Sequence, residues 1–326
     1  MKKKYKIAVV NSSSFGKIYT QHLERLKKIG EVSFFNFDSE IEGKELANRL
    51  NGYNMIIASV TPYFGKEFFD NKDELLLLSR HGIGYNTIDV EAAKKHGTVV
   101  TIVPALIERD AVAENNITNL LSIMRKTGEA NHAVKTDNWK IRASFLGDGL
   151  SGTTVGVIGV GNIGSRVVEI LNYGFRCNVL GYDPNVDELS MERFGAKKVG
   201  LDELLSMSDE ICICASLNED NYHMLSTKEF NKMKKGVYIS NTARGALVDE
   251  KALLEAVNSG VVEGFATDVM EIEPSDSSHP YNHSDKILVT PHTSAYTNKC
   301  LSGMGEKCVS DCEAVANGKL PNRIVS

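Results

Sequence analysis

A glycine-rich stretch over residues 154–164 constrains the fold more than any other part of the chain. Gly159, Gly161 and Gly164 follow the spacing G-x-G-x-x-G. The apolar residues before Gly159 predict a buried strand, and residues 165–171 predict an amphipathic helix. In this setting the first glycine permits a tight turn, the second lets a pyrophosphate approach the backbone, and the third lets the helix pack close to the strand. The stretch therefore predicts a dinucleotide site, with the phosphates at the helix N-terminus.

An acidic residue further along supports the same interpretation and indicates which dinucleotide is bound. A second predicted strand, residues 178–182, ends at Asp183, which lies 183 − 164 = 19 residues after Gly164. An acid at this distance reaches the ribose hydroxyls of adenosine. Its charge would repel a 2′-phosphate, and Pro184 and Asn185 supply no arginine to bind one. The pattern favours NAD over NADP. The alternative is a purely structural strand–turn–helix with a surface aspartate.

Length and composition are those of an ordinary globular protein. A chain of 326 residues predicts two domains, and its residues are 42% hydrophobic and 24% charged. The net charge of −5 does not indicate a basic surface that would bind nucleic acid or an anionic membrane. The basic Met1–Lys4 is followed by a short apolar run only, and no stretch of about 18 apolar residues occurs. We therefore expect neither a signal peptide nor a membrane span, and the cytoplasm is the default location.

The cysteines predict neither disulfides nor a metal site. No histidine lies close to them in sequence to complete a familiar zinc pattern, so small buried thiols are the simplest interpretation. The six are Cys177, Cys212, Cys214, Cys300, Cys308 and Cys312.

Strands and helices alternate along the whole chain, which predicts parallel sheets covered by helices. In the first part, the expected strands are 7–10, 32–37, 55–60 and 99–103, the expected helices are 18–29 and 41–50, and 68–78 is a helix or partly a strand. In the second part, the expected strands after the glycine stretch are 178–182, 211–215, 237–240, 264–267 and 286–290, and the expected helices are 201–207, 227–233, 250–257 and 297–315.

Two segments admit more than one interpretation. Residues 109–126 predict a long helix with a broad apolar stripe, which fits either a core helix or a helix at a domain or subunit interface. The glycine-containing loop 80–86 could form a small anion cradle from its backbone amides, but from these residues alone an ordinary turn is the better interpretation.

Three residues that could perform chemistry follow predicted strands of the second part. Arg244, Glu273 and His292 come after the strands that end near 240, 267 and 290. Ligands of an open parallel sheet bind beyond the carboxyl ends of its strands, so we expect the three side chains at one edge. Imidazole can move a proton, a carboxylate beside it fixes the tautomer, and guanidinium grips a carboxylate through a planar two-pronged contact. The set suits reduction of a carbonyl in a carboxylic acid.

These segments, in this order, resemble the D-isomer-specific 2-hydroxyacid dehydrogenase family. The resemblance covers most of the chain. It is carried by Gly159–Gly164, Asn241–Glu250, Asp268–Pro274 and Thr290–His292, by residues 81–89, which resemble the family's substrate loop, and by Met304–Lys307 and Gly318–Pro321.

The resemblance implies an α/β fold with two Rossmann-like, doubly wound parallel-sheet domains and an active site in the cleft between them. The substrate domain would be discontinuous, formed by residues 1–102 and 296–326. The NAD-binding domain would be residues 103–295. The long helix from Arg109 matches the segment that family members use to form dimers, so we expect a homodimer.

The resemblance also implies roles for individual residues. Arg244 binds the substrate carboxylate and carbonyl oxygen, His292 is the general acid/base, and Glu273 holds His292. The substrate-binding set is Ile83, Gly84, Tyr85, Arg244 and Tyr296, and Tyr63 and Phe64 are further candidates for a small, partly apolar pocket. The implied contacts to NAD are Gly159, Gly161, Asn162, Ile163, Gly164, Asp183, Ala215, Ser216, Asn221, Thr242, Ala243, Asp268 and His292, with Asp268 near the nicotinamide amide.

The function expected from the residues and the resemblance is NAD-dependent, reversible reduction of a small 2-oxo acid to the D-2-hydroxy acid. One alternative is activity on D-3-phosphoglycerate or hydroxypyruvate. Two features weaken this alternative. Ser59 stands where phosphoglycerate-oxidising members tend to carry an arginine, and the chain ends without their regulatory extension. Another alternative is a non-catalytic regulator that senses NAD(H), against which the presence of Arg244, Glu273 and His292 argues. Ser216 departs from the proline that is frequent in the family, which alters the adenine-side wall.

Overall fold

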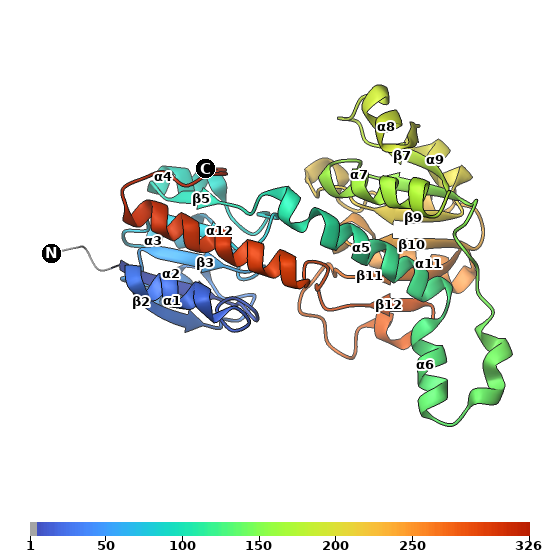
Figure 1. Cartoon of the computed structure of the whole chain (residues 1–326), viewed down its shortest axis with the longest axis horizontal. Helices are drawn as coiled ribbons and strands as arrows, with labels where there is room; N and C mark the ends of the chain where they lie inside the picture. Colours follow the sequence, from blue (N-terminus) through green and yellow to red (C-terminus); the bar gives the residue numbers. More distant parts are fainter. Residues whose placement is uncertain (1–4) are drawn as a thin grey trace. The chain divides into compact units, whose positions relative to one another are not determined.

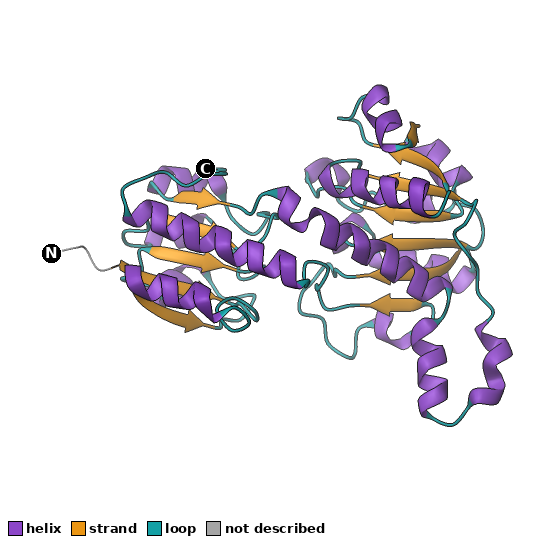
Figure 2. Cartoon of the chain, in the orientation of Figure 1, coloured by secondary structure: helices purple, strands orange, loops and turns teal. Residues whose placement is uncertain are grey.

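The computed structural model describes residues 5–326, which form two compact units. The first contains the described residues up to Glu108 together with Tyr296–Ser326, and the second contains Arg109–Ala295. Each unit is built on its own parallel sheet, of five and seven strands (Figures 1 and 2). This confirms the predicted α/β fold class. The assignment of substrate and cofactor to one unit or the other stays a prediction.

The first unit is a sheet in the order β2-β1-β3-β4-β5. Its strands are β1 (Tyr5–Val10), β2 (Gly30–Phe35), β3 (Met55–Ala58), β4 (Leu77–Arg80) and β5 (Val99–Thr101). Its helices are α1 (Thr20–Ile29), α2 (Gly43–Arg49), α3 (Lys66–Asn71), α4 (Val90–His96) and α12 (Asn298–Ala316). The segment 68–78 thus contains the end of one helix and the start of a strand.

Both faces of this sheet are buried. Side chains of a strand alternate between the two faces, so neighbouring residues of β1 lie in different apolar clusters. Ile7 and Val9 of β1 pack in one apolar cluster with Cys308 and Cys312 of α12. Ala8 of β1 packs in another cluster, with residues of α2, α3 and α4. The last helix of the chain therefore completes the core of the unit that begins it.

The second unit has the strand order β12-β11-β10-β9-β6-β7-β8. Its strands are β6 (Thr154–Ile158), β7 (Asn178–Tyr182), β8 (Ala196–Lys198), β9 (Glu210–Ile213), β10 (Val237–Asn241), β11 (Val262–Thr267) and β12 (Ile287–Val289). Its helices are α5 (Ala105–Met124, which starts just before the boundary), α6 (Thr127–Lys135), α7 (Asn162–Glu169), α8 (Glu188–Phe194), α9 (Leu201–Met207), α10 (Thr227–Phe230) and α11 (Glu250–Ser259). Short 3-10 or π-helical segments lie at 139–145, 170–174, 219–221, 245–247 and 280–283.

The chain winds away from β6 in both directions, so the order reverses between β6 and β9. Such a reversal opens a crevice at the carboxyl ends of the two strands, where nucleotides bind in this architecture. The glycine stretch leaves β6 at this point.

The long helix α5 packs as the core interpretation predicted, and its place at a subunit interface stays a prediction. Its apolar stripe, which includes Ala113, Leu120 and Met124, is buried in the core of the second unit. The stripe is therefore a core feature. Exposed apolar side chains come after the helix: Trp139 is 68% exposed and Leu146 is 83% exposed.

All six cysteines are free thiols, and five are buried, as the simplest interpretation predicted. Burial raises the pKa of Cys177 to about 11 and that of Cys308 to about 12. From residue 5 to the C-terminus, no helix has the length and apolarity required to cross a bilayer.

A buried carboxyl at the amino-terminal edge of the second sheet makes stability depend on pH. Burial raises the pKa of Glu210 to about 7. The nearby charges of Asp209 and Asp148 act in the same direction, while the hydrogen bond from Thr153 and the charge of Lys234 oppose it. The folded state therefore binds an extra proton between pH of about 4.5 and 7, and the free energy of unfolding falls as pH rises through this window.

Glu210→Gln is expected to remove this fall, because glutamine fits the same space and does not ionise. The variant should exceed the parent protein by about 3 kcal/mol at pH 8 and match it near pH 4. Urea denaturation at both pH values measures the difference. Glu263→Gln, at a half-exposed carboxylate paired with Lys286, is the matched control and should show no comparable pH dependence. An equal difference at pH 4 and pH 8 would contradict the prediction.

Candidate active site

Three neighbouring strands bring Arg244, Glu273 and His292 to one edge of the second sheet. β10, β11 and β12 are adjacent and parallel, so their carboxyl ends lie together. Arg244 follows β10, Glu273 follows β11 and His292 follows β12, each after a short turn. The sequence placed these side chains after strands, and the fold places those strands side by side.

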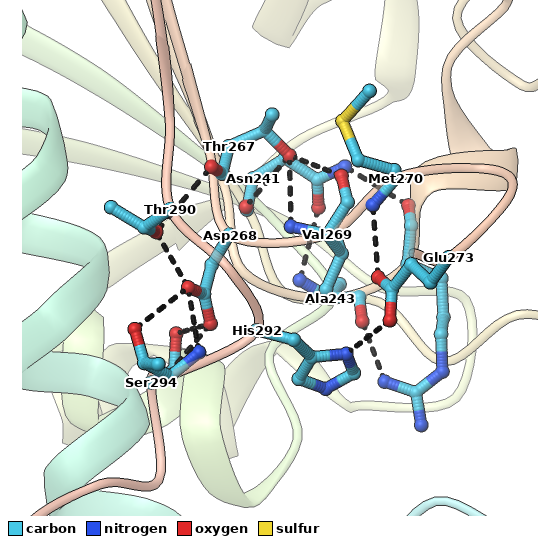
Figure 3. Close-up of polar contacts among 12 residues, drawn as sticks. Asn241, Ala243, Thr267, Asp268, Val269, Met270, Glu273, Thr290, His292 and Ser294 are labelled. Carbon is cyan, nitrogen blue, oxygen red and sulfur yellow. Dashed lines mark hydrogen bonds and ion pairs between the residues drawn. The ribbon is translucent and has the colours of Figure 1, made fainter. Parts of the chain in front are cut away.

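Glu273 and His292 point toward each other and form a hydrogen-bonded pair (Figure 3). His292 Nδ1 lies 2.7 Å from Glu273 Oε2, and Glu273 Oε1 accepts a hydrogen bond of 2.9 Å from the Met270 N–H. A carboxylate can only accept, so Nδ1 carries the hydrogen, and Nε2 is the nitrogen that can exchange a proton with a ligand.

The charge of Glu273 is maintained despite its burial. Burial by itself raises the pKa of this carboxyl. The hydrogen bond and charge of His292, with the Met270 N–H and the charge of Arg244, outweigh burial and hold the pKa below its usual range. The site therefore keeps an anion behind the imidazole at neutral pH, and the anion stabilises a protonated ring.

Asn241, the last residue of β10, shapes the turn that carries Arg244. Its side chain is fully buried; Nδ2 donates to the Arg244 carbonyl at 2.9 Å, and Oδ1 accepts from the Ala243 N–H at 3.0 Å. Arg244 also donates from Nη1 to the Ala243 carbonyl at 2.6 Å. Asn241 is not among the residues predicted from the sequence to act at the site. Two polar residues, Ser240 and Asn241, at the end of an apolar strand were the available signal.

Gly245 brings the turn of Arg244 against the turn of Glu273. A Cβ atom on Gly245 would lie 2.1 Å from the carbonyl carbon of Met270 and 2.2 Å from the nitrogen of Glu271, both backbone atoms. No side chain fits there unless the backbone moves. Glycine at this position therefore sets how closely the guanidinium-bearing turn approaches the carboxylate-bearing turn.

Asp268 holds the turn that carries His292. Its Oδ1 accepts from the Thr290 hydroxyl at 2.5 Å and the Thr293 N–H at 2.9 Å, and its Oδ2 accepts from the N–H and hydroxyl of Ser294 at 2.7 and 2.5 Å (Figure 3). The His292 N–H donates to the Asp268 carbonyl. His292 itself has a φ of 53°, a strained value that such contacts stabilise. The predicted place of Asp268 near the nicotinamide amide stays a prediction.

The three glycines of the fingerprint differ in what surrounds them. Gly159 has a φ of +86°, and a Cβ there would lie 2.4 Å from the Cα of Ala215. A Cβ on Gly164 would lie 1.9 Å from the Gly159 carbonyl oxygen, whereas Gly161 has nothing within 4 Å. The turn and the packing thus require the first and third glycines. The open space at Gly161, before the N-terminus of α7, fits a pyrophosphate that approaches the backbone.

Most of the other residues predicted to contact the dinucleotide follow β7 and β9 or begin α7. Asp183 follows β7; its Oδ2 accepts from the Val160 N–H at 2.9 Å, which ties it to the glycine turn. Ala215 and Ser216 follow β9 on the other side. Asn221 donates to the Ser216 carbonyl at 2.7 Å. Asn162 and Ile163 begin α7.

Gly161→Ala is expected to weaken binding of NADH and leave the fold intact. The methyl group meets no protein atom, but it occupies the approach of the pyrophosphate and costs at least one charge-assisted hydrogen bond. The dissociation constant should rise about tenfold to a hundredfold, with stability changed by less than about 1 kcal/mol. Fluorescence titration with NADH measures the affinity. Gly200→Ala, also in open space but before α9, is the control. Unchanged affinity in Gly161→Ala would contradict the placement of the phosphates.

The other predicted substrate residues belong to the first unit. Ile83, Gly84 and Tyr85 lie in the loop after β4, and no residue from 5 to 326 accepts a hydrogen bond from the N–H groups of Ile83 and Gly84. Tyr296 is half-exposed, and its hydroxyl lies 2.6 Å from Ser13 Oγ. The two free amides fit an anion cradle. The substrate roles of these residues stay predictions.

Fold and site together define an oxidoreductase with an NAD-binding domain, and comparison with known proteins identifies its family. The profile of the "D-isomer specific 2-hydroxyacid dehydrogenase, NAD binding domain" matches residues 117–294. A glyoxylate reductase from Thermococcus litoralis is 30% identical over 310 residues, 93% of each chain. A D-3-phosphoglycerate dehydrogenase from Archaeoglobus fulgidus is 34% identical over 280 residues, 86% of this chain and 52% of that protein.

A solved structure is similar over nearly the whole chain. The D-lactate dehydrogenase of Aquifex aeolicus, crystallised with NAD and lactic acid, superposes with a TM-score of 0.83 at 27% identity, covering 98% of both chains. The chain belongs to the D-isomer-specific 2-hydroxyacid dehydrogenase family, as its motifs indicated.

Proposed function

We propose that this protein uses NADH to reduce a small, unphosphorylated 2-oxo acid to the D-2-hydroxy acid, reversibly. The observation that carries the proposal is the Glu273–His292 pair with Arg244 on adjacent strand ends, in the same unit as the dinucleotide fingerprint. Relatives named glyoxylate reductase and D-lactate dehydrogenase make glyoxylate and pyruvate the first candidates.

Each residue of the trio has a chemical task in this reaction. Bound NADH supplies the hydride that adds to the carbonyl carbon. Arg244 binds the substrate carboxylate and the carbonyl oxygen, which orients the carbonyl and stabilises negative charge as it develops on oxygen. His292 donates a proton from Nε2 to that oxygen and takes it back in the oxidation direction. Glu273 keeps the ring oriented through Nδ1 and stabilises its protonated form.

We infer a preference for NAD over NADP from Asp183. Its two carboxylate oxygens accept hydrogen bonds from the backbone of Val160 and Asn185, which fixes the anion beside the glycine turn. A fixed negative charge in the position that binds the ribose hydroxyls repels a 2′-phosphate. NADPH should therefore be used much less efficiently than NADH.

A phosphorylated substrate is the second candidate, since one relative is a D-3-phosphoglycerate dehydrogenase. Ser59, beyond the end of β3, offers no positive charge to a phosphate. The argument therefore favours unphosphorylated acids. A regulator that binds NADH without turnover is the third candidate.

We also propose a homodimer, formed through the segment 127–146 that follows α5. This segment extends from the second unit in Figure 1 and exposes Val134, Trp139, Ile141 and Leu146. Apolar side chains gathered in this way on one segment are typical of an interface with another protein, and the segment directly follows the helix from Arg109 that, by the resemblance, family members use to form dimers. Light scattering on the purified protein should give twice the mass of one chain. A monomeric mass across the micromolar range would contradict the proposal.

The test of the function is turnover with a panel of acids, each with NADH and with NADPH. Pyruvate, glyoxylate, hydroxypyruvate, 2-oxoisocaproate, phenylpyruvate and 3-phosphohydroxypyruvate vary in size and charge. Rapid oxidation of NADH with one or two unphosphorylated acids is the expected result. Preference for the phosphorylated acid would replace the first candidate by the second. Tight binding of NADH with no turnover on any acid would favour the regulator.

A further inference from the structure

Three asparagines of α5, of which Asn116 and Asn119 are buried and Asn115 is half-buried, contact both turns of the active site. Asn115 Nδ2 donates to Ser294 Oγ at 2.8 Å, Asn116 Nδ2 donates to Thr242 Oγ1 at 2.9 Å, and Asn119 Nδ2 makes a longer contact of 3.4 Å with Thr290 Oγ1. Residues three and four apart share one face of a helix, so the amides form a single polar strip. Thr242 belongs to the turn of Arg244; Thr290 and Ser294 flank His292.

The chemistry of these groups fixes the direction of the hydrogen bonds. An amide nitrogen only donates, and a carboxylate only accepts. The Ser294 hydroxyl accepts from Asn115 and must therefore donate its own hydrogen to Asp268, 2.5 Å away. The same direction holds from Asn119 through Thr290 to Asp268. The helix thus reaches the Asp268 carboxylate, which in turn holds the backbone around His292.

Asn116 costs stability where it stands. The residue is fully buried, and its Oδ1 has no hydrogen-bond partner in the described part of the chain. Its neighbours in the helix, Ala113, Ile117 and Leu120, belong to an apolar cluster. A buried acceptor without a partner destabilises a fold, and an apolar side chain of similar size would not. What the amide does provide is a donor that fixes the hydroxyl of Thr242.

We propose that Asn115 and Asn116, supported by Asn119, are positioning residues that hold the Arg244 turn and the His292 turn in register with each other. The inference rests on the proposed function, because it concerns how substrate-carboxylate binding by Arg244 and proton transfer by His292 act on one substrate. Catalysis requires such groups to stay within a fraction of an ångström of their productive placement.

The test compares variants of α5 that remove a donor with one that does not. Asn116→Leu removes the donor and the orphaned acceptor together, and Asn115→Asp keeps the shape but cannot donate. Thr118→Ala is the control, since this exposed hydroxyl donates to the Glu114 carbonyl of its own helix. In both test variants kcat should fall about tenfold or more, with KM for NADH changed less than twofold. The urea midpoint of Asn116→Leu should equal or exceed that of the parent protein, an outcome that a purely structural role would not give.

A second measurement does not depend on turnover. The 15N resonances of the His292 ring report its tautomer and the hydrogen bond at Nδ1, and His292→Gln identifies them. They should move in Asn115→Asp and stay in place in Thr118→Ala. Parent-like kcat and unchanged ring resonances in both test variants would overturn the inference. Failure of the proposed function is a different result: no acid is reduced by the parent protein, while the ring resonances still respond to Asn115→Asp.

Discussion

His292→Gln is expected to lower kcat by about a hundredfold to ten-thousandfold, the range that positioned proton transfer contributes in enzymes. Glutamine can still donate a hydrogen bond to Glu273, so the buried carboxylate keeps a neutral partner and the turn keeps its packing. What is lost is a group that can release a proton to the carbonyl oxygen and recover it. Steady-state kinetics with the best acid of the panel measure the effect.

Binding of NADH and the stability of the fold serve as controls for this variant. Both should stay close to those of the parent protein, because neither the fingerprint turn nor the core is changed. Glu273→Gln should give a smaller loss, since the ring remains but its orientation and its protonated form are less well stabilised. A kcat within threefold of the parent value in His292→Gln would rule out this histidine as the acid/base.

Arg244→Ala should lower kcat/KM by about thirtyfold to several thousandfold, which corresponds to about 2–5 kcal/mol for removing one partner of a desolvated charge pair. The loss should appear strongly in KM, because the guanidinium binds the substrate carboxylate before and during the reaction. Arg244→Lys keeps the charge but lacks the planar fork, so it should recover only part of the loss.

A pair of related substrates separates carboxylate binding from general damage. Glyoxylate and glyoxal share a reducible aldehyde, and only glyoxylate carries the carboxylate. The parent protein should strongly prefer glyoxylate, and Arg244→Ala should lose most of that preference while its affinity for NADH is retained. A variant that lost both substrates equally would show that Arg244 acts on the carbonyl oxygen or on the shape of the site and not on the carboxylate.

Much of the fold could be predicted because apolar periodicity and glycine spacing are local signals. The strand 178–182 and the helix 201–207 have the predicted bounds. The short helices α4 and α8 and the strand β8 were missed. The helix α4 buries only Ala92 and Ala93 and so carries no apolar stripe; only its caps, Asp89 and Gly97, mark it. The helix α6 was missed because it buries Ala133 alone.

The residues of the candidate site also fall into those that local sequence could predict and those that it could not. Arg244, Glu273 and His292 could be proposed because each follows a strand, and parallel strands end at one edge. Asn116 could not, since it lies 242 − 116 = 126 residues before its partner Thr242, and a run of asparagines in a helix suggests a solvent-facing side. Local sequence shows which side chains are polar. Only the tertiary structure shows which of them meet.

The place of α12 has a consequence for how the protein is made. Cys308, Val309 and Cys312 fill the core between β1, β3 and β4, yet they are synthesised nearly three hundred residues after β1. The second unit is continuous in sequence and can fold as soon as it leaves the ribosome. The first unit must wait, with one face of its sheet covered only in part by α1, until α12 has been synthesised. Nascent chains that stall before residue 298 should therefore present that apolar face to chaperones, although their second unit is already folded.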